Sequence, residues 1–238
     1  HWSNPTADGG KRNICREPIR QNRTPEEGED ARIRQRAPFT EAELNEVIQL
    51  GKKGKAPGPD GIVMELIKWL SQQNRDILLK TINSWWEAEE APKELYYAKV
   101  ATLYKKGETS KAENYRPISL LSGFYKIYMM LIRARIQREV EDIVSKAQYG
   151  FRPAKSTAHA IYIIRRLQDY AEKTKGPLYM TLLDWEKAFD KVDHDTLGYA
   201  LERMGIDQKI IAALRDGYDK ATFFVKDDFG ISDNKTQK

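Results

Sequence analysis

The chain has 238 residues, of which 40% are hydrophobic, so it is long enough to bury a core and a globular fold is expected. Its 40 Lys and Arg residues against 35 Asp and Glu residues give a net charge of +5, which permits polyanionic partners without specifying them. The single cysteine excludes an intrachain disulfide and a cysteine-based zinc cluster, and no apolar run is long enough to cross a membrane, so we expect a protein of the nucleus or cytoplasm with no membrane partner.

The first part of the chain is expected to be a linker or a disordered segment. Residues 1–38 are rich in Arg, Glu, Asn, Pro and Gly and have almost no apolar periodicity, so they cannot bury enough surface to become ordered. We therefore place the folded domain at residues 39–238. It opens with Thr40 and Glu43 in a capping-box pattern, followed by apolar residues at helical spacing, which predicts a helix.

Further helices and a strand are predicted in the next segment. The sequence KAPGPD at residues 55–60 contains two prolines and a glycine and is typical of an ordered loop or turn. Apolar spacing predicts helices over 62–70 and 77–86, the second ending by Pro92. Residues 96–104 are rich in β-branched and aromatic side chains and predict a strand, with a polar, lysine-bearing turn after it.

The second half of the chain alternates long helical patterns with short apolar runs. The run LYMTLL at residues 178–183 has the length and composition of a buried strand, and it ends at Asp184. The other predicted elements are helices over 122–144, 156–173, 196–204 and 208–219 and a strand over 221–225.

An acidic cluster follows the predicted strand that ends at Asp184. Its other members are Glu186, Asp190, Asp193 and Asp195. Carboxylates gathered at a strand end can bind Mg²⁺, a hard cation that takes oxygen ligands. Acidic residues are also common in the first turn of a helix, where they are merely solvated, and composition alone favours this second interpretation.

Four segments together resemble a known family. In chain order they are KAPGPDGIVMELIK, NYRPISLLSGFYKI, QYGFRPAKSTAHAI and LLDWEKAFDKVDHDTL. Their order is similar to that of the successive motifs of reverse transcriptases from non-LTR, LINE-like retrotransposons, with group II intron polymerases as relatives. One such motif would be weak evidence, but four in the family's order make a chance match implausible. The resemblance therefore reverses the interpretation of Asp184 in favour of metal binding.

The resemblance implies an α+β fold, namely the right-hand polymerase fold with mostly helical fingers and a partial, incomplete palm sheet. It implies an enzyme, an RNA-directed DNA polymerase. Such an enzyme uses an RNA template, a DNA primer, deoxynucleoside triphosphates and two Mg²⁺ ions.

The resemblance also assigns roles near the acidic cluster. Asp184 matches the palm aspartate that binds both metal ions, and the backbone carbonyl of Trp185 would assist with one of them. Phe189 matches the aromatic position that excludes the 2′-hydroxyl of a ribonucleotide, and its alternative role is core packing. Asp190 would anchor the turn of the motif and is not expected to be a ligand.

Basic residues would bind the incoming nucleotide. Arg116 in NYRP matches the fingers arginine that clamps the triphosphate, a role that suits a planar guanidinium, while a surface ion pair is the alternative. Lys105 or Lys106 would supply a second positive charge, and the sequence leaves this choice open. Lys53 and Lys55 fit contacts with template phosphates as well as they fit a merely solvated role.

The QYGFR segment is expected to bind nucleic acid rather than to catalyse. Gln148, Gly150, Phe151 and Arg152 match a family motif that lies near the template strand and the nascent base pair.

Two palm motifs of the family are absent from these residues, a segment of the form QGxPxSP and a hairpin with two adjacent aspartates. Asp227 and Asp228 lie before the position of the missing motifs, so we interpret them as an unrelated pair in a hairpin. Because one carboxylate cannot assemble a two-ion site, we expect these residues alone to be inactive as a polymerase. The alternative function is a non-catalytic, nucleic-acid-binding remnant of such an element.

Overall fold

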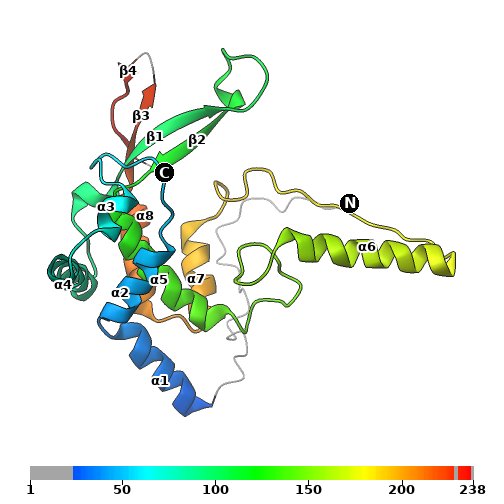
Figure 1. Cartoon of the computed structure of the whole chain (residues 1–238), viewed down its shortest axis with the longest axis horizontal. Helices are drawn as coiled ribbons and strands as arrows, with labels where there is room; N and C mark the ends of the chain where they lie inside the picture. The colour runs from blue at the N-terminus through cyan, green and yellow to red at the C-terminus, as the bar shows by residue number, and fades with distance from the viewer. Residues whose placement is uncertain (1–23, 228–229, 237–238) are drawn as a thin grey trace, which may run out of the picture.

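Helices make up most of the chain, and a small sheet rises from one end of them (Figure 1). This computed structural model describes residues 24–227 and 230–236. The α-helices are α1 (Pro25–Arg36), α2 (Glu41–Leu50), α3 (Met64–Lys68), α4 (Gln72–Ala88), α5 (Gly123–Val140), α6 (Thr157–Thr174), α7 (His194–Arg203) and α8 (Gln208–Asp219). The strands are β1 (Tyr97–Tyr104), β2 (Tyr115–Leu120), β3 (Thr222–Asp227), β4 (Gly230–Ile231) and β5 (Lys235–Thr236), and two short 3-10 helices are η1 (Lys93–Tyr96) and η2 (Ala112–Asn114). The predicted α+β class is confirmed.

The helices predicted from apolar spacing are all present. At the start of α2 the Thr40 hydroxyl accepts the Glu43 N–H at 3.2 Å, and the Glu43 carboxylate accepts the Thr40 N–H at 2.9 Å, which confirms the capping box. The helices α5 to α8 begin and end within a few residues of the predicted limits. Local caps and periodicity therefore determine these elements.

One hydrophobic core joins α2, α4, α5 and α8. Its largest fully buried side chains are Leu44, Ile48, Ile67, Ile82, Trp86, Ile127, Leu131, Ile132 and Ile210. Phe39 contacts both Trp86 and Tyr128 through its ring, with centroid separations of 5.0 and 6.3 Å. The core thus connects the N-terminal half of the chain to the helix that precedes β3.

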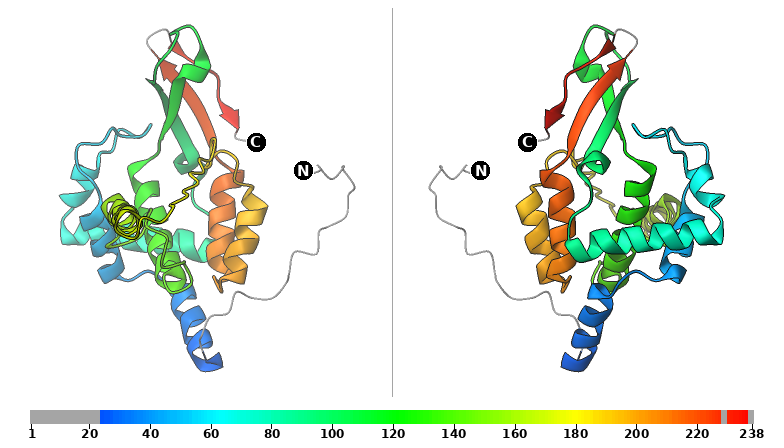
Figure 2. Two further views of the ribbon diagram at one scale, coloured as in Figure 1. Left: turned by 90° about the vertical axis from the view of Figure 1, so that its right-hand side faces the viewer. Right: turned by 90° about the vertical axis from the view of Figure 1, so that its left-hand side faces the viewer.

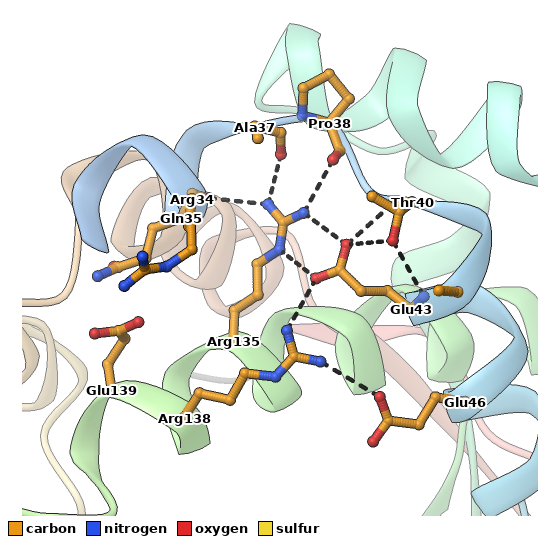
Figure 3. A pocket seen from close by; sticks show the side chains of 11 residues that line it. Arg34, Gln35, Ala37, Pro38, Thr40, Glu43, Glu46, Arg135, Arg138 and Glu139 are labelled. Atoms are coloured by element: carbon orange, nitrogen blue, oxygen red, sulfur yellow. Dashed lines mark hydrogen bonds and ion pairs between the residues drawn. The ribbon is translucent and has the colours of Figure 1, made fainter. Parts of the chain in front are cut away.

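A buried arginine fixes the segment before α2 (Figure 3). Arg135 of α5 is 5% exposed and donates to the Glu43 carboxylate through Nε and Nη2, both at 3.0 Å. Its Nη1 donates to the carbonyls of Gln35 and Ala37, and its guanidinium lies 4.1 Å from the centroid of the Phe39 ring. Burial alone would raise the pKa of Glu43, but the hydrogen bonds from Arg135 and Thr40 lower it below its ordinary value.

Helix α1 lies within the segment that we expected to be a linker. A second capping box starts it, because the Thr24 hydroxyl accepts the Glu27 N–H at 3.2 Å and the Glu27 carboxylate accepts the Thr24 N–H at 2.8 Å. Gln35 is 2% exposed, and Arg36 donates to the carboxylate of Asp207 at 2.7 Å. Polar contacts with the start of α8 hold this helix, and composition carries no sign of them. The rest of the expected linker, residues 1–23, lies outside the described residues.

The sheet has the strand order β2-β1-β3-β4, and β5 pairs with the first two residues of β3. Strands β1 and β2 form an antiparallel hairpin in which Leu103 lies opposite Arg116, whereas β1 and β3 are parallel. The sequence did not predict β2, which contains Pro117. A proline is tolerated there because β2 is the edge strand. In the β3–β4 hairpin Asp227 pairs with Gly230, and Asp228 lies outside the described residues.

Helix α6 projects away from the other helices, and none of its residues is buried (Figures 1 and 2). The predicted strand over Leu178–Leu183 is wrong, because residues 176–193 return from the far end of α6 to α7 without forming a strand or helix. A strand forms only where neighbouring strands accept its backbone hydrogen bonds. None of the described strands lies beside this run, and Leu182 and Leu183 are 90% and 83% exposed.

Candidate active site

The residues of the acidic cluster have different surroundings, and Glu186 forms an ion pair with Lys191 at 3.2 Å. Asp193 caps α7 by accepting the Thr196 N–H at 2.7 Å, and hydrogen bonding to Thr196 lowers the pKa of Asp193. Asp195 forms an ion pair with Arg215 at 3.5 Å. The helix-start interpretation therefore holds for these two residues. Asp184 and Asp190 are exposed and make no hydrogen bond or ion pair with any other residue that the structure describes.

Two exposed phenylalanines bring the Asp184 segment and the QYGFR segment together. The rings of Phe151 and Phe189 meet edge to face, with centroids 6.0 Å apart. Phe189 is 80% exposed and Phe151 is 87% exposed, so neither belongs to the hydrophobic core. Phe189 therefore does not have the alternative role of packing in the core. Trp185, next to Asp184, is also 81% exposed.

The QYGFR segment is a loop that Arg152 holds in place. The Arg152 guanidinium donates to the Glu141 carboxylate at 2.6 Å and to the carbonyl of Ser145 at 2.8 Å, and its side chain is 12% exposed. Gln148 donates to the carbonyl of Gly150 at 3.2 Å. These contacts are internal to the chain. Arg152 thus acts as a positioning residue for its neighbour Phe151, whose ring is left in solvent.

The predicted nucleotide-binding cations lie on the β1–β2 hairpin. Arg116 is exposed on β2, and its side chain makes no hydrogen bond or ion pair within the described part of the chain. The hairpin loop is ordered, because Lys105 donates its backbone N–H to Asn114 at 2.8 Å and the Tyr104 hydroxyl donates to the carbonyl of Gly107 at 2.6 Å. Lys105 and Lys106 are both exposed. Fixed backbone and free cationic side chains are suited to anion binding.

The loop that contains Lys53 and Lys55 is docked against the start of α5. A side chain at Gly58 would meet the carbonyl of Leu121 at 2.3 Å, so only glycine fits there. The Asp60 carboxylate accepts the N–H of Gly123 at 3.0 Å and the N–H of Ile62 at 3.1 Å. The sequence analysis missed this role of Asp60. The pattern of Asp before Gly is a signal for such a side-chain-supported turn.

The predicted site residues are only partly brought together. The structure brings Phe151 and Phe189 into contact. Among the described residues, no hydrogen bond or ion pair joins Asp184 to Arg116 or to the predicted lysines. Within residues 24–227 and 230–236, no three His, Cys, Asp or Glu side chains lie close enough to hold a metal ion together. No described helix is both long and apolar enough to cross a membrane.

Comparison with known proteins adds an independent finding. A family model described as reverse transcriptase (RNA-dependent DNA polymerase) matches residues 103–235, more than half of the chain. The "Transposon TX1 uncharacterized 149 kDa protein" of Xenopus laevis is 28% identical over 195 residues, covering 82% of this chain and 15% of that protein. The "RNA-directed DNA polymerase from mobile element jockey" of Drosophila melanogaster is 29% identical over 197 residues, covering 80% and 21%. The chain thus spans roughly 15 to 21% of the length of these relatives.

Proposed function

Because this chain belongs to the reverse transcriptase (RNA-dependent DNA polymerase) family, we propose that it supplies the fingers and the first palm motif of an RNA-directed DNA polymerase of a non-LTR retrotransposon. The single observation that supports this most strongly is that the family match covers both Arg116 and Asp184. The substrates would be an RNA template, a DNA primer and deoxynucleoside triphosphates. The polypeptide would act in the nucleus or cytoplasm.

Arg116 and Lys105 would bind the incoming triphosphate. Leu103 and Arg116 are paired residues of β1 and β2 and therefore share one face of the hairpin. Side chains alternate along a strand, and the hydrogen bond from Lys105 to Asn114 extends the ladder by one residue beyond β1. Lys105 then belongs to the face of Arg116, whereas Lys106 lies beyond this ladder, in the bend that follows it. The position of Lys105 on the same face as Arg116 favours Lys105 over Lys106 as the second residue that binds the triphosphate.

Asp184 would be a metal ligand, with the carbonyl of Trp185 beside it. The family uses divalent metal ions, and we propose Mg²⁺, which prefers carboxylate and carbonyl oxygens. Such ions supply charge stabilisation and activation of the primer hydroxyl when they are bound. The described residues do not form a complete two-ion site, since no group of three His, Cys, Asp or Glu side chains that could hold a metal ion occurs among them. The exposure of Asp184 and its lack of any internal partner leave its oxygens available.

The two phenylalanines would contact the substrates from different sides. Phe189 would lie against the sugar of the nucleotide and exclude a 2′-hydroxyl. Phe151, with Gln148 and Gly150, would contact the template, and an exposed aromatic ring suits stacking on a base. Arg152 would support this loop rather than contact nucleic acid, because its donors already bond within the chain.

The test is primer extension by the polypeptide translated from the complete open reading frame that contains these residues. A labelled DNA primer is annealed to an RNA template or to a DNA template of the same sequence. We expect deoxynucleotides to be added on the RNA template in the presence of Mg²⁺. A folded polypeptide that binds the primer–template but adds no nucleotide would contradict the proposed activity and favour a binding role.

A further inference from the structure

Three lysines line one recess between the α2–α3 loop and the start of α5. Lys52 and Lys55 come from the loop, and Lys126 comes from the first turns of α5. The recess has a volume of about 160 Å³, whereas one water in the liquid takes up about 30 Å³, so it has room for more than one water molecule. Its remaining lining is largely apolar, including Ile62 and Met64.

Within the described residues, no ion pair compensates the charges of these three lysines. None of the three lysine side chains makes a hydrogen bond or ion pair with another residue in the described part of the chain. Two acidic side chains next to the recess in sequence bond to backbone groups instead: Asp60 of the loop accepts two N–H groups, and Glu65 of α3 accepts the Gly54 N–H at 2.5 Å. An anion bound in the recess would compensate the charges of the lysines that line it.

The side chains of the three lysines, and not the backbone N–H groups at the start of α5, would bind an anion in this recess. The first N–H of α5, that of Gly123, is already bonded to Asp60, and the Ser122 hydroxyl caps the next turn by accepting from Tyr125. The loop that carries Lys55 is held rigidly, because Gly58 packs on the Leu121 carbonyl. The backbone positions from which these lysines extend are therefore set by the fold before any ligand arrives.

We propose that Lys52, Lys55 and Lys126 bind a backbone phosphate of single-stranded nucleic acid. This inference rests on the proposed function, because it takes the RNA template as the source of the phosphate. Lysine is suited to phosphates as a compact point charge that does not read sequence. Leu120 is the last residue of β2 and lies on the side of the recess, shortly before α5. Arg116 lies near the start of β2, roughly 13 Å from Leu120 at the usual rise of a strand. One phosphate group would therefore not contact both Arg116 and the recess.

The test is the salt dependence of binding between the 238-residue chain and a labelled single-stranded RNA, measured by fluorescence anisotropy. We expect Lys52→Gln/Lys126→Gln to reduce the slope of log affinity against log salt by about 0.7 for each phosphate that the variant no longer neutralises. The matched control is Lys80→Gln/Lys173→Gln, which removes two exposed lysines of α4 and α6 and should leave the slope unchanged. Circular dichroism establishes that each variant is folded.

Two further measurements separate the alternatives. If the RNA slope is unchanged in the Lys52/Lys126 variant but its affinity for tripolyphosphate falls, the recess binds a nucleotide phosphate and the template assignment is overturned. Primer extension by the complete polypeptide is measured in parallel. If the unmodified polypeptide extends the primer normally but the lysine variant has an unchanged RNA slope, phosphate binding in the recess is overturned and the proposed activity stands. If the slope depends on the lysines but the unmodified polypeptide does not extend the primer, phosphate binding in the recess is supported and the proposed activity is contradicted.

Discussion

The rings of Phe151 and Phe189 meet edge to face at an interplanar angle of 89°, although they belong to two different family motifs. Both rings are otherwise largely in solvent. Through this contact the loop that carries Phe151 meets the segment that carries Asp184. The contact gives the two motifs a shared surface next to the proposed metal ligand.

Replacement of Phe189 should change substrate selection without changing stability. Because the side chain is 80% exposed, Phe189→Ala is expected to alter the free energy of unfolding by less than about 0.5 kcal/mol. In the complete polypeptide the same change should admit ribonucleotides, while Phe189→Tyr should still exclude them. Incorporation of each nucleotide type by single-turnover extension measures this. Retained discrimination in Phe189→Ala would contradict the gate role.

Replacement of Arg116 should weaken nucleotide binding selectively. Its guanidinium has no partner among the described residues, so Arg116→Ala should raise the KM for deoxynucleotide while template affinity stays nearly the same. Lys105→Ala should act in the same direction. Lys106→Ala is the matched control, because Lys106 lies beyond the last paired position, in the bend of the hairpin loop. Equal effects of the two lysine changes would refute the choice of Lys105.

The pair formed by Arg135 and Glu43 should be a strong determinant of stability. Removing Arg135 leaves Glu43 with only the longer ion pair to the exposed Arg138, at 3.5 Å, and takes the donor from three backbone carbonyls, so Arg135→Ala is expected to cost about 3 to 5 kcal/mol of unfolding free energy. The double variant Arg135→Met/Glu43→Gln should recover part of this loss, because it removes both charges of the pair. Urea unfolding of the chain measures both effects. A loss below about 1 kcal/mol for Arg135→Ala would contradict this role.

The same pair predicts a dependence of stability on pH. The pKa of Glu43 is lower in the folded chain than its ordinary value of 4.5, so the unfolded chain binds the proton more readily. The contribution of Glu43 is therefore fully present above pH 4.5 and is lost as the pH falls through the lower pKa of the folded chain. We expect Glu43→Gln to flatten the decline in stability below pH 4.5. An identical acid profile in the variant would show that other groups cause the decline.

The elements that sequence analysis predicted well are those with local signals. The capping box at Thr40 and Glu43 and the apolar spacing of α5 and α8 depend on residues within a few positions of one another. The same holds for the proposed chemistry of Arg116, which rests on a short motif.

The predictions that failed depend on distant partners. The run at residues 178–183 has strand composition, but a strand needs neighbours, and none of the described strands pairs with it. Conversely, α1 has little apolar character, and its contacts with Asp207 and Arg135 join residues far apart in the chain. Lys126 was overlooked for the same reason, since the fold and not the sequence brings it beside Lys55.

The central claim, that these residues belong to a polymerase in which Asp184 binds the catalytic metal, is tested most directly by primer extension with two matched variants of the complete polypeptide. Asp184→Asn and Asp190→Asn make the same chemical change at two exposed positions of one irregular segment. We predict that Asp184→Asn abolishes extension on an RNA template without weakening RNA binding, and that Asp190→Asn retains most of the activity. Undiminished extension by Asp184→Asn would contradict the account.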